Sequence, residues 1–429
     1  MAKKYDVIVV GAGPAGLMAA RTATQEGLDV LLVEQKKEIS KVRRSCAQAL
    51  ATAPGYNGET VTVEGEKIIF HINDFSIKYS GSWLDIKNFF HISPNGSKII
   101  VERDETPVGK IFNKEVLLSD LLSEVEQSGC EIENGTMGIK AENTNGEVVV
   151  TLESKGKQRE VSARIVIAAD GINSRIVQSL GLNKSRKFFG TPRVVSYVLE
   201  GVQSPYPNAF ILFLGKGRTN GLYPMVTEKS GEPPLFQISG GSEEAINRFL
   251  TQSKFSSWFK GVKVLQRKSA VLNFHTPILE PVVGNVVIAG DAAAFIEVFV
   301  QGALVYGFRA AKAAAKELKE GHGFTEYVDY WKTSFGYNQP GKIEDSCRMA
   351  LGMLAMEDEE LDYLFALLEP QKLKSYYDEF GYPRLIMSGI MSRIGKIRKE
   401  QPDLARKVKM LYEGNLEEII KIGMKGYMA

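Results

Sequence analysis

The 429-residue sequence predicts an α/β fold with a parallel sheet, an interleaved antiparallel sheet and a helical C-terminal region. The parallel sheet is predicted by Asp6–Gln35 and Pro281–Leu318, because in each stretch a β-branched apolar strand leads through glycine into a helical segment. Between them, Arg193–Leu272 shows short apolar runs separated by glycine, proline and charged turns. That pattern favours antiparallel strands.

The composition is that of an ordinary globular protein, with 44% hydrophobic and 24% charged residues. The length predicts two or three domains, and the net charge of +2 gives no reason to expect a nucleic-acid partner. The cysteines Cys46, Cys130 and Cys347 lie far apart without C-x-x-C spacing, so we expect neither a disulfide framework nor a metal site. The chain enters its first strand directly after MAKKY, and no apolar run is long enough to span a membrane. We expect a cytoplasmic protein, soluble or peripheral to a membrane.

The first stretch has the pattern of a Rossmann-type βαβ unit, with elements predicted over Asp6–Val10, Leu17–Glu26 and Val30–Val33. Gly11, Gly13 and Gly16 between the first two give the G-x-G-x-x-G spacing. Gly11 permits the tight turn, Gly13 lets the backbone approach a pyrophosphate, and Gly16 lets the helix pack against the strand. Glu34 ends the second strand, where a carboxylate can accept hydrogen bonds from ribose hydroxyls. An acid at that position argues against a 2′-phosphate.

A basic connection and a β-rich segment, Tyr56–Val101, follow this unit. The cations of the connection could meet phosphates of a cofactor or substrate, although a solvated loop gives the same pattern. They are Lys36, Lys37, Lys41, Arg43 and Arg44. Lys110–Gly129 has helical spacing, and the strand Arg164–Ala169 ends in Asp170 and Gly171. Loops at strand carboxyl ends face the ligand in such sheets, so both residues are candidates for the cofactor site, while Asp170 can also cap the next helix.

In the antiparallel segment, Tyr206, Phe210 and Tyr223 are candidates for lining a substrate pocket, although strand aromatics also form cores. The second α/β stretch brings Gly290 and Asp291 to the end of a strand and the start of a long helix. The rest of the chain has helical composition, and its cationic part, Lys396–Lys409, could lie on an anionic membrane or form a solvated face.

Three separated motifs carry a family resemblance: GAGPAG with Glu34, ADGINSRI over Ala169–Ile176, and GNVVIAGDAAAF over Gly284–Phe295. In their order and spacing the chain resembles the glutathione-reductase-type flavoproteins with the p-hydroxybenzoate hydroxylase fold. The resemblance implies FAD, with Glu34 on the adenosine ribose and Asp291 on the ribityl chain; Lys114 stands where many relatives have arginine. The implied cofactor-binding residues are Gly11, Gly13, Pro14, Ala15, Gly16, Glu34, Gln35, Lys114, Asp170, Gly171, Gly290, Asp291, Gly302 and Ala303.

The motifs and strand pattern together predict a discontinuous division of the chain. An FAD-binding domain is expected from residues 1–55, 102–190 and 280–320. A β-rich substrate domain is expected from 56–101 and 191–279, followed by a helical C-terminal region over 321–429.

Within this class the chain looks most like the geranylgeranyl reductase family, which reduces isolated prenyl double bonds. It has no second G-x-G-x-x-G, a cysteine follows the second strand, and Tyr223 precedes a proline in the middle sheet. The resemblance implies hydride transfer from reduced FAD to a hydrophobic isoprenoid or lipid substrate. Cys46 is the candidate proton donor or positioning group, unless it is a buried structural cysteine. Glu297 and Gln301 depart from the family's glycine-rich loop, and would recognise a polar group, shuttle protons, or form a salt bridge or helix cap.

Other functions remain open at this level. A monooxygenase of the same fold would consume NAD(P)H and oxygen. An electron-transfer flavoprotein of the quinone-oxidoreductase type would need a partner for its iron–sulfur cluster, because three dispersed cysteines cannot supply four ligands. A non-catalytic FAD-binding or lipid-carrying protein is the third alternative. For the reductase, the electron donor would be reduced ferredoxin, another flavoprotein or NAD(P)H.

Overall fold

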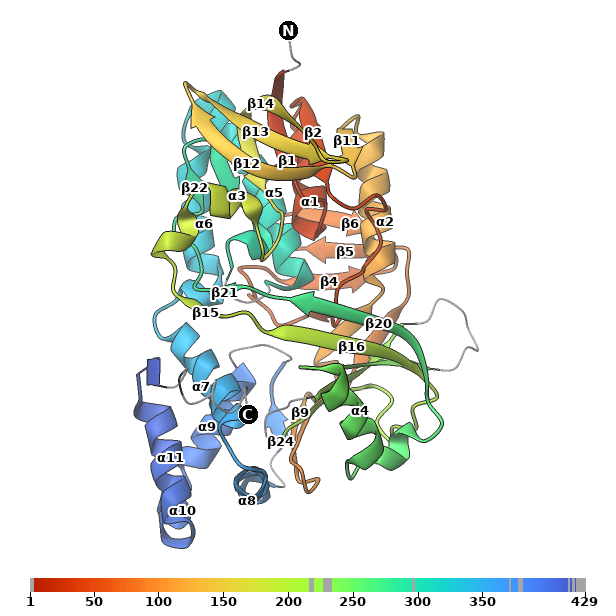
Figure 1. The fold of residues 1–429 in the computed structure, drawn as a ribbon, viewed down its shortest axis with the longest axis vertical. Helices are drawn as coiled ribbons and strands as arrows, with labels where there is room; N and C mark the ends of the chain where they lie inside the picture. The colour runs from red at the N-terminus through yellow and green to blue at the C-terminus, as the bar shows by residue number, and fades with distance from the viewer. Residues whose placement is uncertain are drawn as a thin grey trace.

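The predicted fold class is confirmed by the computed structural model, in which a nucleotide-binding sheet and its helices adjoin a second large sheet and a cluster of C-terminal helices (Figure 1). The structure describes residues 4–215, 220–226, 234–294, 298–369, 372–376, 381–415, 417–418 and 421.

The first sheet carries the Rossmann-type unit. Its strands, in spatial order, are β11 (Glu131–Asn134), β2 (Val30–Glu34), β1 (Lys4–Val10), β14 (Lys157–Ala168), β13 (Glu147–Ser154) and β12 (Met137–Thr144), with β23 (Val286–Ile288) beside β14 and β22 (Val282–Val283) beside β23. β1 pairs in parallel with β2 and β14, and β14 pairs in parallel with β23. β2 and β23 are buried along their whole length, as expected for parallel strands covered on both faces. The carboxyl ends of β1, β14 and β23 therefore meet at one edge.

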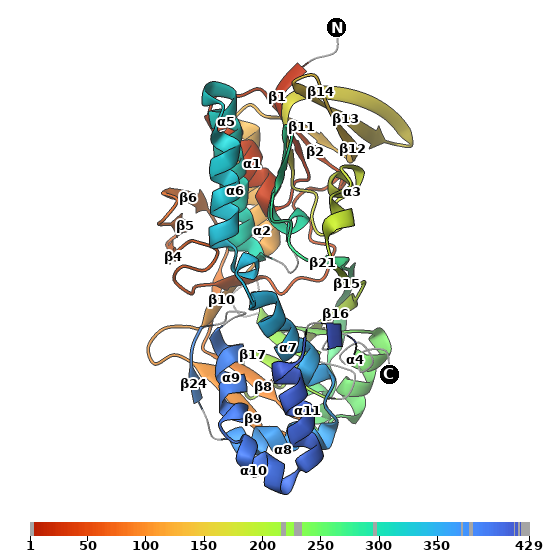
Figure 2. The same cartoon turned by 90° about the vertical axis from the view of Figure 1, so that its left-hand side faces the viewer.

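Helices α1 (Pro14–Gln25), α2 (Lys114–Gln127), α5 (Phe299–Glu320) and α6 (Gly323–Ser334) cover one face of this sheet (Figure 2). The short helix α3 (Arg175–Ser179) lies on the other side, beside β12. Helix α5 crosses α1 closely. A Cβ at Gly307 would lie 2.1 Å from the Ala15 carbonyl oxygen, so only glycine allows the two backbones to approach this far. This contact ties the second α/β stretch to the first.

The second large sheet is mixed, with parallel pairs only at β8–β17 and β9–β24 among the described residues. In spatial order its strands are β20 (Lys263–Val271), β16 (Arg193–Glu200), β19 (Leu235–Gly240), β18 (Asn220–Met225), β17 (Ala209–Phe213), β8 (Asn88–Ile92), β9 (Lys98–Glu102) and β24 (Lys372–Lys374). One face packs on α4 (Glu243–Gln252) and the turn η2 (Ser256–Phe259). The other face meets the small sheet that follows the first βαβ unit.

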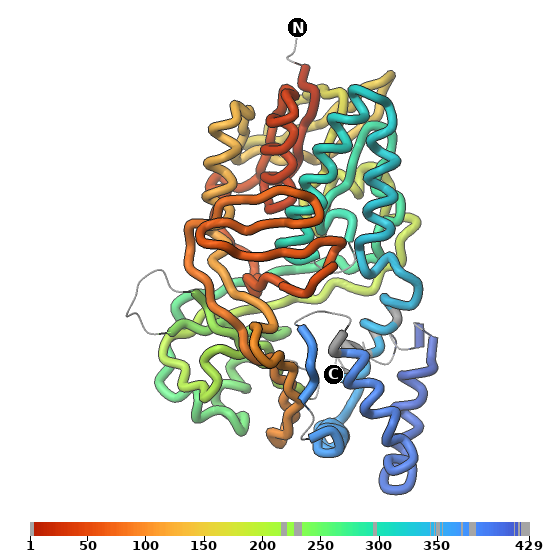
Figure 3. The backbone as a smooth tube through the Cα atoms, turned by 180° about the vertical axis from the view of Figure 1, so that it is seen from behind, coloured from red at the N-terminus to blue at the C-terminus, as the bar shows by residue number. Residues whose placement is uncertain are grey.

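Two three-stranded sheets accompany the two large ones. Their strands are β3 (Ala49–Ala51), β10 (Gly109–Phe112) and β7 (Trp83–Ile86), then β4 (Val61–Glu64), β5 (Lys67–Phe70) and β6 (Phe75–Lys78). The strands β4–β6 pack on the helices of the nucleotide-binding half, and they are orange when that half is seen from behind (Figure 3). The predicted helix from Lys110 is wrong at its start, because β10 occupies those residues. Helix α2 begins at Lys114, where the Asn113 side chain accepts hydrogen bonds from two first-turn amides.

In the described part of the C-terminal region, β24 joins the second sheet and was not predicted, and the other regular elements are helices. Its helices are α7 (Lys342–Leu354), α8 (Asp358–Leu368), α9 (Gly381–Met391), α10 (Ile394–Glu400) and α11 (Pro402–Glu413). The remaining short elements are β15 (Phe188–Gly190), β21 (Phe274–His275), η1 (Leu182–Ser185), η3 (Gly290–Ala292) and η4 (Gly336–Asn338). No helix in the described part of the chain has the length and apolar character needed to cross a membrane.

Candidate functional site

The glycine turn after β1 has the geometry that its spacing predicted. Gly11 has a φ of +98°, and a Cβ there would lie 2.5 Å from the Ala169 carbonyl oxygen. A Cβ at Gly16 would lie 1.7 Å from the Gly11 carbonyl oxygen. At Gly13, by contrast, a Cβ would meet nothing within 4 Å. The first two glycines therefore serve packing, whereas Gly13 borders open space that a ligand can enter.

The N-terminus of α1 points from this turn toward the same space. Pro14 begins the helix, and within the described chain no side chain caps its first turn. The N–H groups of that turn are thus available to an anion. Gly290 sits against the helix, since a Cβ there would come 3.0 Å from the Ala15 Cβ. The first and last sequence motifs are therefore in contact.

The Glu34 carboxylate lies at the end of β2, with 6% of the residue exposed. It accepts hydrogen bonds from the Ala12 amide (2.7 Å) and the Lys36 amide (2.8 Å). Burial lowers the pKa of Lys36, against the raising effect of the Glu34 charge. Gln35, next in the chain, is exposed. Glu34 thus both fixes the glycine turn and marks the strand end at which a ribose would lie.

Asp170 and Gly171 follow β14 at the same edge of the sheet. The Asp170 carboxylate accepts hydrogen bonds from the Ser174 hydroxyl (2.6 Å) and the amides of Arg175 (2.9 Å) and Ile176 (3.3 Å). Burial raises the pKa of Asp170, and these hydrogen bonds act in the opposite direction. Asp170 therefore caps the start of α3, while Gly171, at φ +83°, has open space beside it.

Asp291 links the strand end of β23 to the basic loop. Its carboxylate lies 3.4 Å from the Arg44 guanidinium and accepts a hydrogen bond from the Val298 amide at 3.2 Å. The preceding Gly290 has a φ of +63°, which favours glycine at this turn. Arg44 is thereby held against the loop that leads into α5.

Other cations of the basic loop pair with carboxylates of the chain. Lys41 lies 3.1 Å from Glu115, and Arg43 lies 3.1 Å from Glu38. The second pair is largely exposed, so it contributes little to stability. The first pair fixes the loop to α2, and the second lies within the loop.

Cys46 lies where the nucleotide-binding half meets the second sheet. The Lys114 ammonium donates to its sulfur at 3.7 Å, and the Lys114 amide donates to the Gln48 side chain at 2.8 Å. Lys268, from β20, lies near enough that the charges of Glu115 and Cys46 act on it, although burial lowers its pKa. A half-buried thiol and two ammonium groups therefore share this junction.

Gln301 is buried in the first turn of α5, with 1% exposed. Among the described residues neither its amide nitrogen nor its amide oxygen has a hydrogen-bond partner. A buried amide left unpaired is costly, so this side chain is suited to a bound group. Ala303 is also buried, and Glu297 lies outside the described residues.

Gly302 allows the start of α5 to pack against the loop after β3. A Cβ there would lie 2.3 Å from the Asn57 amide nitrogen, which donates to the Val298 carbonyl at 2.7 Å. Phe299, the first residue of α5, has a φ of +59°, in the left-handed region that side chains rarely adopt. The polypeptide around this helix start is therefore tightly determined.

The aromatic candidates separate onto two faces of the second sheet. Phe210 and Tyr223 stack with centroids 4.8 Å apart in the apolar cluster beneath β3, β7 and β10. Both are more than nine-tenths buried, so in this structure they form core. Tyr206 lies on the other face, where it packs on Phe90 and accepts a hydrogen bond from Lys98 at 2.9 Å. Its predicted place in the pocket is not supported by this position.

Sequence reasoning missed a set of polar residues on the site-facing side of that sheet, namely Ser45, Ser196, Gln237 and Ser239. The signal that could have found them is the alternation of polar and apolar residues along the strand. In LFQISG the glutamine and the serine occupy the same face of a strand whose other face carries the phenylalanine and the isoleucine.

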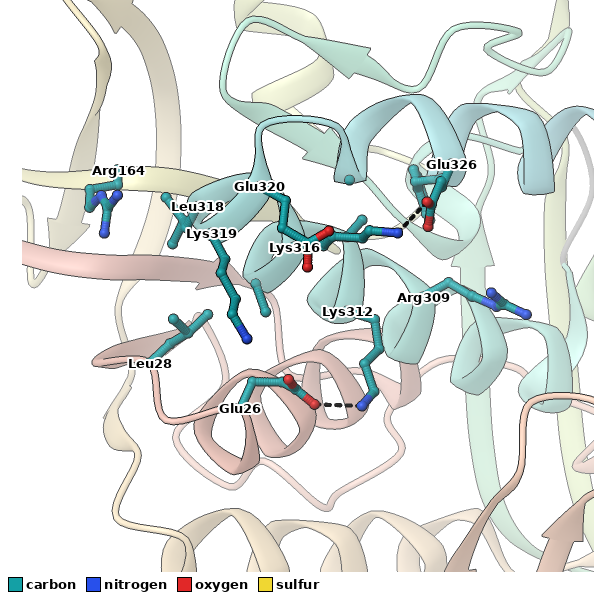
Figure 4. A pocket seen from close by; sticks show the side chains of 14 residues that line it. Glu26, Leu28, Arg164, Arg309, Lys312, Lys316, Leu318, Lys319, Glu320 and Glu326 are labelled. Atoms are coloured by element: carbon teal, nitrogen blue, oxygen red, sulfur yellow. Dashed lines mark hydrogen bonds and ion pairs between the residues drawn. The ribbon is translucent and has the colours of Figure 1, made fainter.

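A surface groove of about 540 Å³ lies elsewhere, between the end of α1 and helices α5 and α6 (Figure 4). Its charged side chains are largely engaged with one another, as in the Lys312–Glu26 and Lys316–Glu326 pairs. Glu26 follows the C-terminus of α1, whereas the glycine turn is at its N-terminus. The groove is therefore separate from the candidate cofactor site.

The residues present fit FAD. The backbone has open space at Gly13 for a ligand to approach. Donors and acceptors for a dinucleotide are present in the uncapped first turn of α1, in the carboxylate that ends β2 and in the unpaired Gln301 amide.

The chain also matches known proteins. Residues 5–196 match the family described as pyridine nucleotide-disulphide oxidoreductase. A digeranylgeranylglycerophospholipid reductase of Methanococcoides burtonii is 26% identical over 385 residues, covering 85% of this chain and 88% of that protein. One from Methanosarcina mazei is 25% identical and covers 98% of this chain and 99% of its own length.

Solved structures share the fold. A geranylgeranyl bacteriochlorophyll reductase-like protein of Thermoplasma acidophilum has a TM-score of 0.70 at 18% identity, covering 95% of this chain and 99% of that one. A p-nitrophenol 4-monooxygenase of Pseudomonas putida has a TM-score of 0.59 at 16% identity, covering 98% and 99%.

The fold, the site and these matches define the protein as an FAD-dependent oxidoreductase. The resemblance to the geranylgeranyl reductases is confirmed by relatives named digeranylgeranylglycerophospholipid reductase, which align over most of the chain.

Proposed function

We propose that the protein reduces carbon–carbon double bonds of a hydrophobic isoprenoid substrate. The observation that carries the proposal is the position of Cys46. On one side, its sulfur contacts Lys114 at the start of α2 in the FAD-binding half. On the other side, the next residue, Ala47, packs on the aromatic cluster of the second sheet that contains Phe210 and Tyr223. The names of the aligned relatives supply the substrate class.

Bound reduced FAD would supply a hydride equivalent to one alkene carbon. The chain has to bind the cofactor, hold the alkene and bring a proton to the other carbon. We propose that the first turn of α1 and Glu34 hold the pyrophosphate and ribose, and that Asp170, Asp291 and Gln301 contact the rest of the cofactor. The apolar cluster on which Ala47 packs would exclude water from the alkene.

An unactivated alkene demands accurate alignment, which gives Cys46 its proposed task. The thiol would pack against the substrate at the junction, and the Lys114 contact at 3.7 Å would fix its position. An external electron donor, whether ferredoxin, another flavoprotein or NAD(P)H, would reduce the enzyme.

The proposal is tested by reducing the purified holoenzyme without oxygen and mixing it with digeranylgeranyl and geranylgeranyl lipids. Reoxidation together with a product two hydrogens heavier by mass spectrometry is expected. A parallel sample in air with a phenolic substrate tests the monooxygenase alternative. Oxygen insertion there, without reaction with the prenyl lipids, would overturn the proposal.

A further inference from the structure

A continuous row of hydroxyl groups crosses the site-facing side of the second sheet. The Tyr223 hydroxyl lies 2.8 Å from the Ser239 hydroxyl, which lies 2.7 Å from that of Ser196. The Ser196 hydroxyl in turn is hydrogen-bonded to that of Ser45, the residue before Cys46. The row passes from β18 through β19 and β16 to the loop at the candidate site.

The inner end of the row is closed and has a fixed donor. Gln237 is fully buried, and its amide nitrogen donates to the Tyr223 hydroxyl and, at 3.4 Å, to that of Ser239. With the amide placed this way, its oxygen has no hydrogen-bond partner among the described residues, and its nitrogen donates to the phenol oxygen. In this placement the phenol proton is directed to Ser239. Tyr223 is 4% exposed and Ser196 is 0% exposed, which separates this end from water.

The same orientation continues outward. The Ser239 hydroxyl accepts from Tyr223 and from the Gln237 amide nitrogen, which occupies both of its lone pairs, so its own proton goes to Ser196. Ser196 is fully buried, and its other hydroxyl neighbour in the row is Ser45, so in this arrangement Ser196 donates to Ser45. The Ser45 hydroxyl proton then points away from the row. Ser45 is itself half-buried. Lys268 faces Ser196 directly across β16 and β20, so an ammonium group lies beside the row.

We propose that this row, Tyr223–Ser239–Ser196–Ser45, delivers the proton that the reduction of the alkene consumes. The proposal rests on the function proposed above. Ser45 gives its proton to the alkene carbon that does not receive hydride, and takes one from Ser196. Ser196 takes one from Ser239, and Ser239 takes one from Tyr223. The phenolate left behind is stabilised by the Gln237 amide, and water returns one proton along the row after the product leaves. Alkene, two electrons with a hydrogen from reduced FAD, and one proton thus give the saturated product.

Tyr223→Phe tests the source of the proton, because it removes the hydroxyl and keeps the ring that stacks on Phe210. The matched control is Tyr197→Phe. That change removes a phenol hydroxyl, bonded to Glu243 at 3.1 Å, from the opposite face of the same sheet. Single-turnover reoxidation of the prereduced holoenzyme by the prenyl lipid should slow about 100-fold in Tyr223→Phe, within the usual range for losing a general acid, and little in the control.

Ser196→Ala breaks the middle of the row and supplies two further measurements. The single-turnover rate should lose the part of its pH dependence that arises from titration of Tyr223, the proposed acid. The solvent deuterium isotope effect on that rate should also change. Independently of activity, the carbon-13 signal of the Tyr223 ring carbon bearing the hydroxyl, assigned with Tyr223→Phe, should shift in Ser196→Ala. FAD occupancy and melting temperature of each variant report whether it folds.

The outcomes separate the two proposals. Wild-type rates, pH profile and isotope effect in folded, FAD-loaded Tyr223→Phe and Ser196→Ala would overturn the relay and leave the reductase function in place. A Tyr223 signal unchanged by Ser196→Ala would also overturn it, since the hydroxyls would then be uncoupled. If wild-type enzyme does not reduce any prenyl lipid, the function fails, and the relay loses its task with it.

Discussion

The Ala12 amide donates a 2.7 Å hydrogen bond to the Glu34 carboxylate, which joins the glycine turn to the end of the neighbouring strand. The same carboxylate accepts from the Lys36 amide at 2.8 Å. Glu34 therefore shapes the turn as well as offering the acceptor that a ribose would need. This double use explains why an acid is needed at a strand end that is nearly closed to solvent.

Glu34→Ala should weaken FAD binding by at least about tenfold, equivalent to about 1.4 kcal/mol. It removes the ribose acceptor and loosens the turn, so the melting temperature of the apoprotein should fall as well. Glu34→Gln keeps one acceptor oxygen and should have an intermediate effect. Fluorescence titration of apoprotein with FAD measures the affinity, and wild-type affinity in both variants would show that Glu34 does not contact the cofactor.

Gly13→Ala and Gly16→Ala should separate binding from folding. A Cβ at residue 16 would overlap the Gly11 carbonyl oxygen at 1.7 Å, so the second variant should be strongly destabilised even without cofactor. A Cβ at residue 13 has no neighbour within 4 Å, so the first variant should fold and fail to retain FAD. Circular dichroism of the apoproteins and flavin content of the purified variants test this. Equal flavin content in Gly13→Ala and wild type would show that the pyrophosphate lies elsewhere.

The sequence predicts the nucleotide-binding half well because its signals are local. The glycines, the β-branched strands and Glu34 each act on neighbours a few residues away or in the adjacent strand. The pairing of β1 with β2 and the hydrogen bond from Ala12 to Glu34 are the contacts that place these residues in the structure.

The rest depends on pairing that no local pattern encodes. β24 is three residues long and is a strand only because β9 offers it an edge. Tyr206 and Phe210 are aromatic residues four positions apart but lie on opposite faces of the sheet, because Phe210 lies within β17 whereas Tyr206 lies in the connection before it. The contact between Ser45 and Ser196 joins residues 151 positions apart.

Cys46→Ala should retain yellow, reducible enzyme and lose alkene reduction by at least about tenfold, because the proposed alignment of the substrate depends on that side chain. Cys46→Ser, which is nearly isosteric, should recover part of the activity. Flavin content, the rate of reduction by dithionite and single-turnover alkene reduction distinguish these steps. If Cys46→Ala instead abolished the solvent isotope effect that the hydroxyl row is expected to control, the thiol itself would be the proton donor.

His91 should make the protein acid-sensitive. It is 3% exposed in β8, its ring is tilted against that of Phe89, and burial lowers its pKa to about 3 from an ordinary value of 6.5. The unfolded chain binds the proton more tightly, so stability is complete above the ordinary pKa and is lost as the pH falls below it. Going from neutral pH to about pH 5 should cost about 2 kcal/mol.

The matched variant for this effect is His91→Phe, which keeps a ring beside Phe89 and cannot titrate. Urea unfolding of both proteins across that pH range gives the comparison. The difference in unfolding free energy between wild type and variant should change by about 2 kcal/mol over the window. A constant difference would mean that His91 is protonated in the folded protein.

Gln301→Leu should have opposite effects on stability and on binding. The amide is 1% exposed and has no hydrogen-bond partner among the described residues, and an unpaired buried polar group costs about 1–3 kcal/mol. Leucine has a similar volume and no polar atoms, so the apoprotein should become more stable by an amount in that range. If the amide is kept for a bound group, the holoenzyme should lose FAD or substrate affinity in return. Thermal melts of apo- and holoprotein, with FAD and substrate titrations, measure both sides. A variant that is less stable without ligand and unchanged in both affinities would show that Gln301 is part of the core and has no ligand to bind.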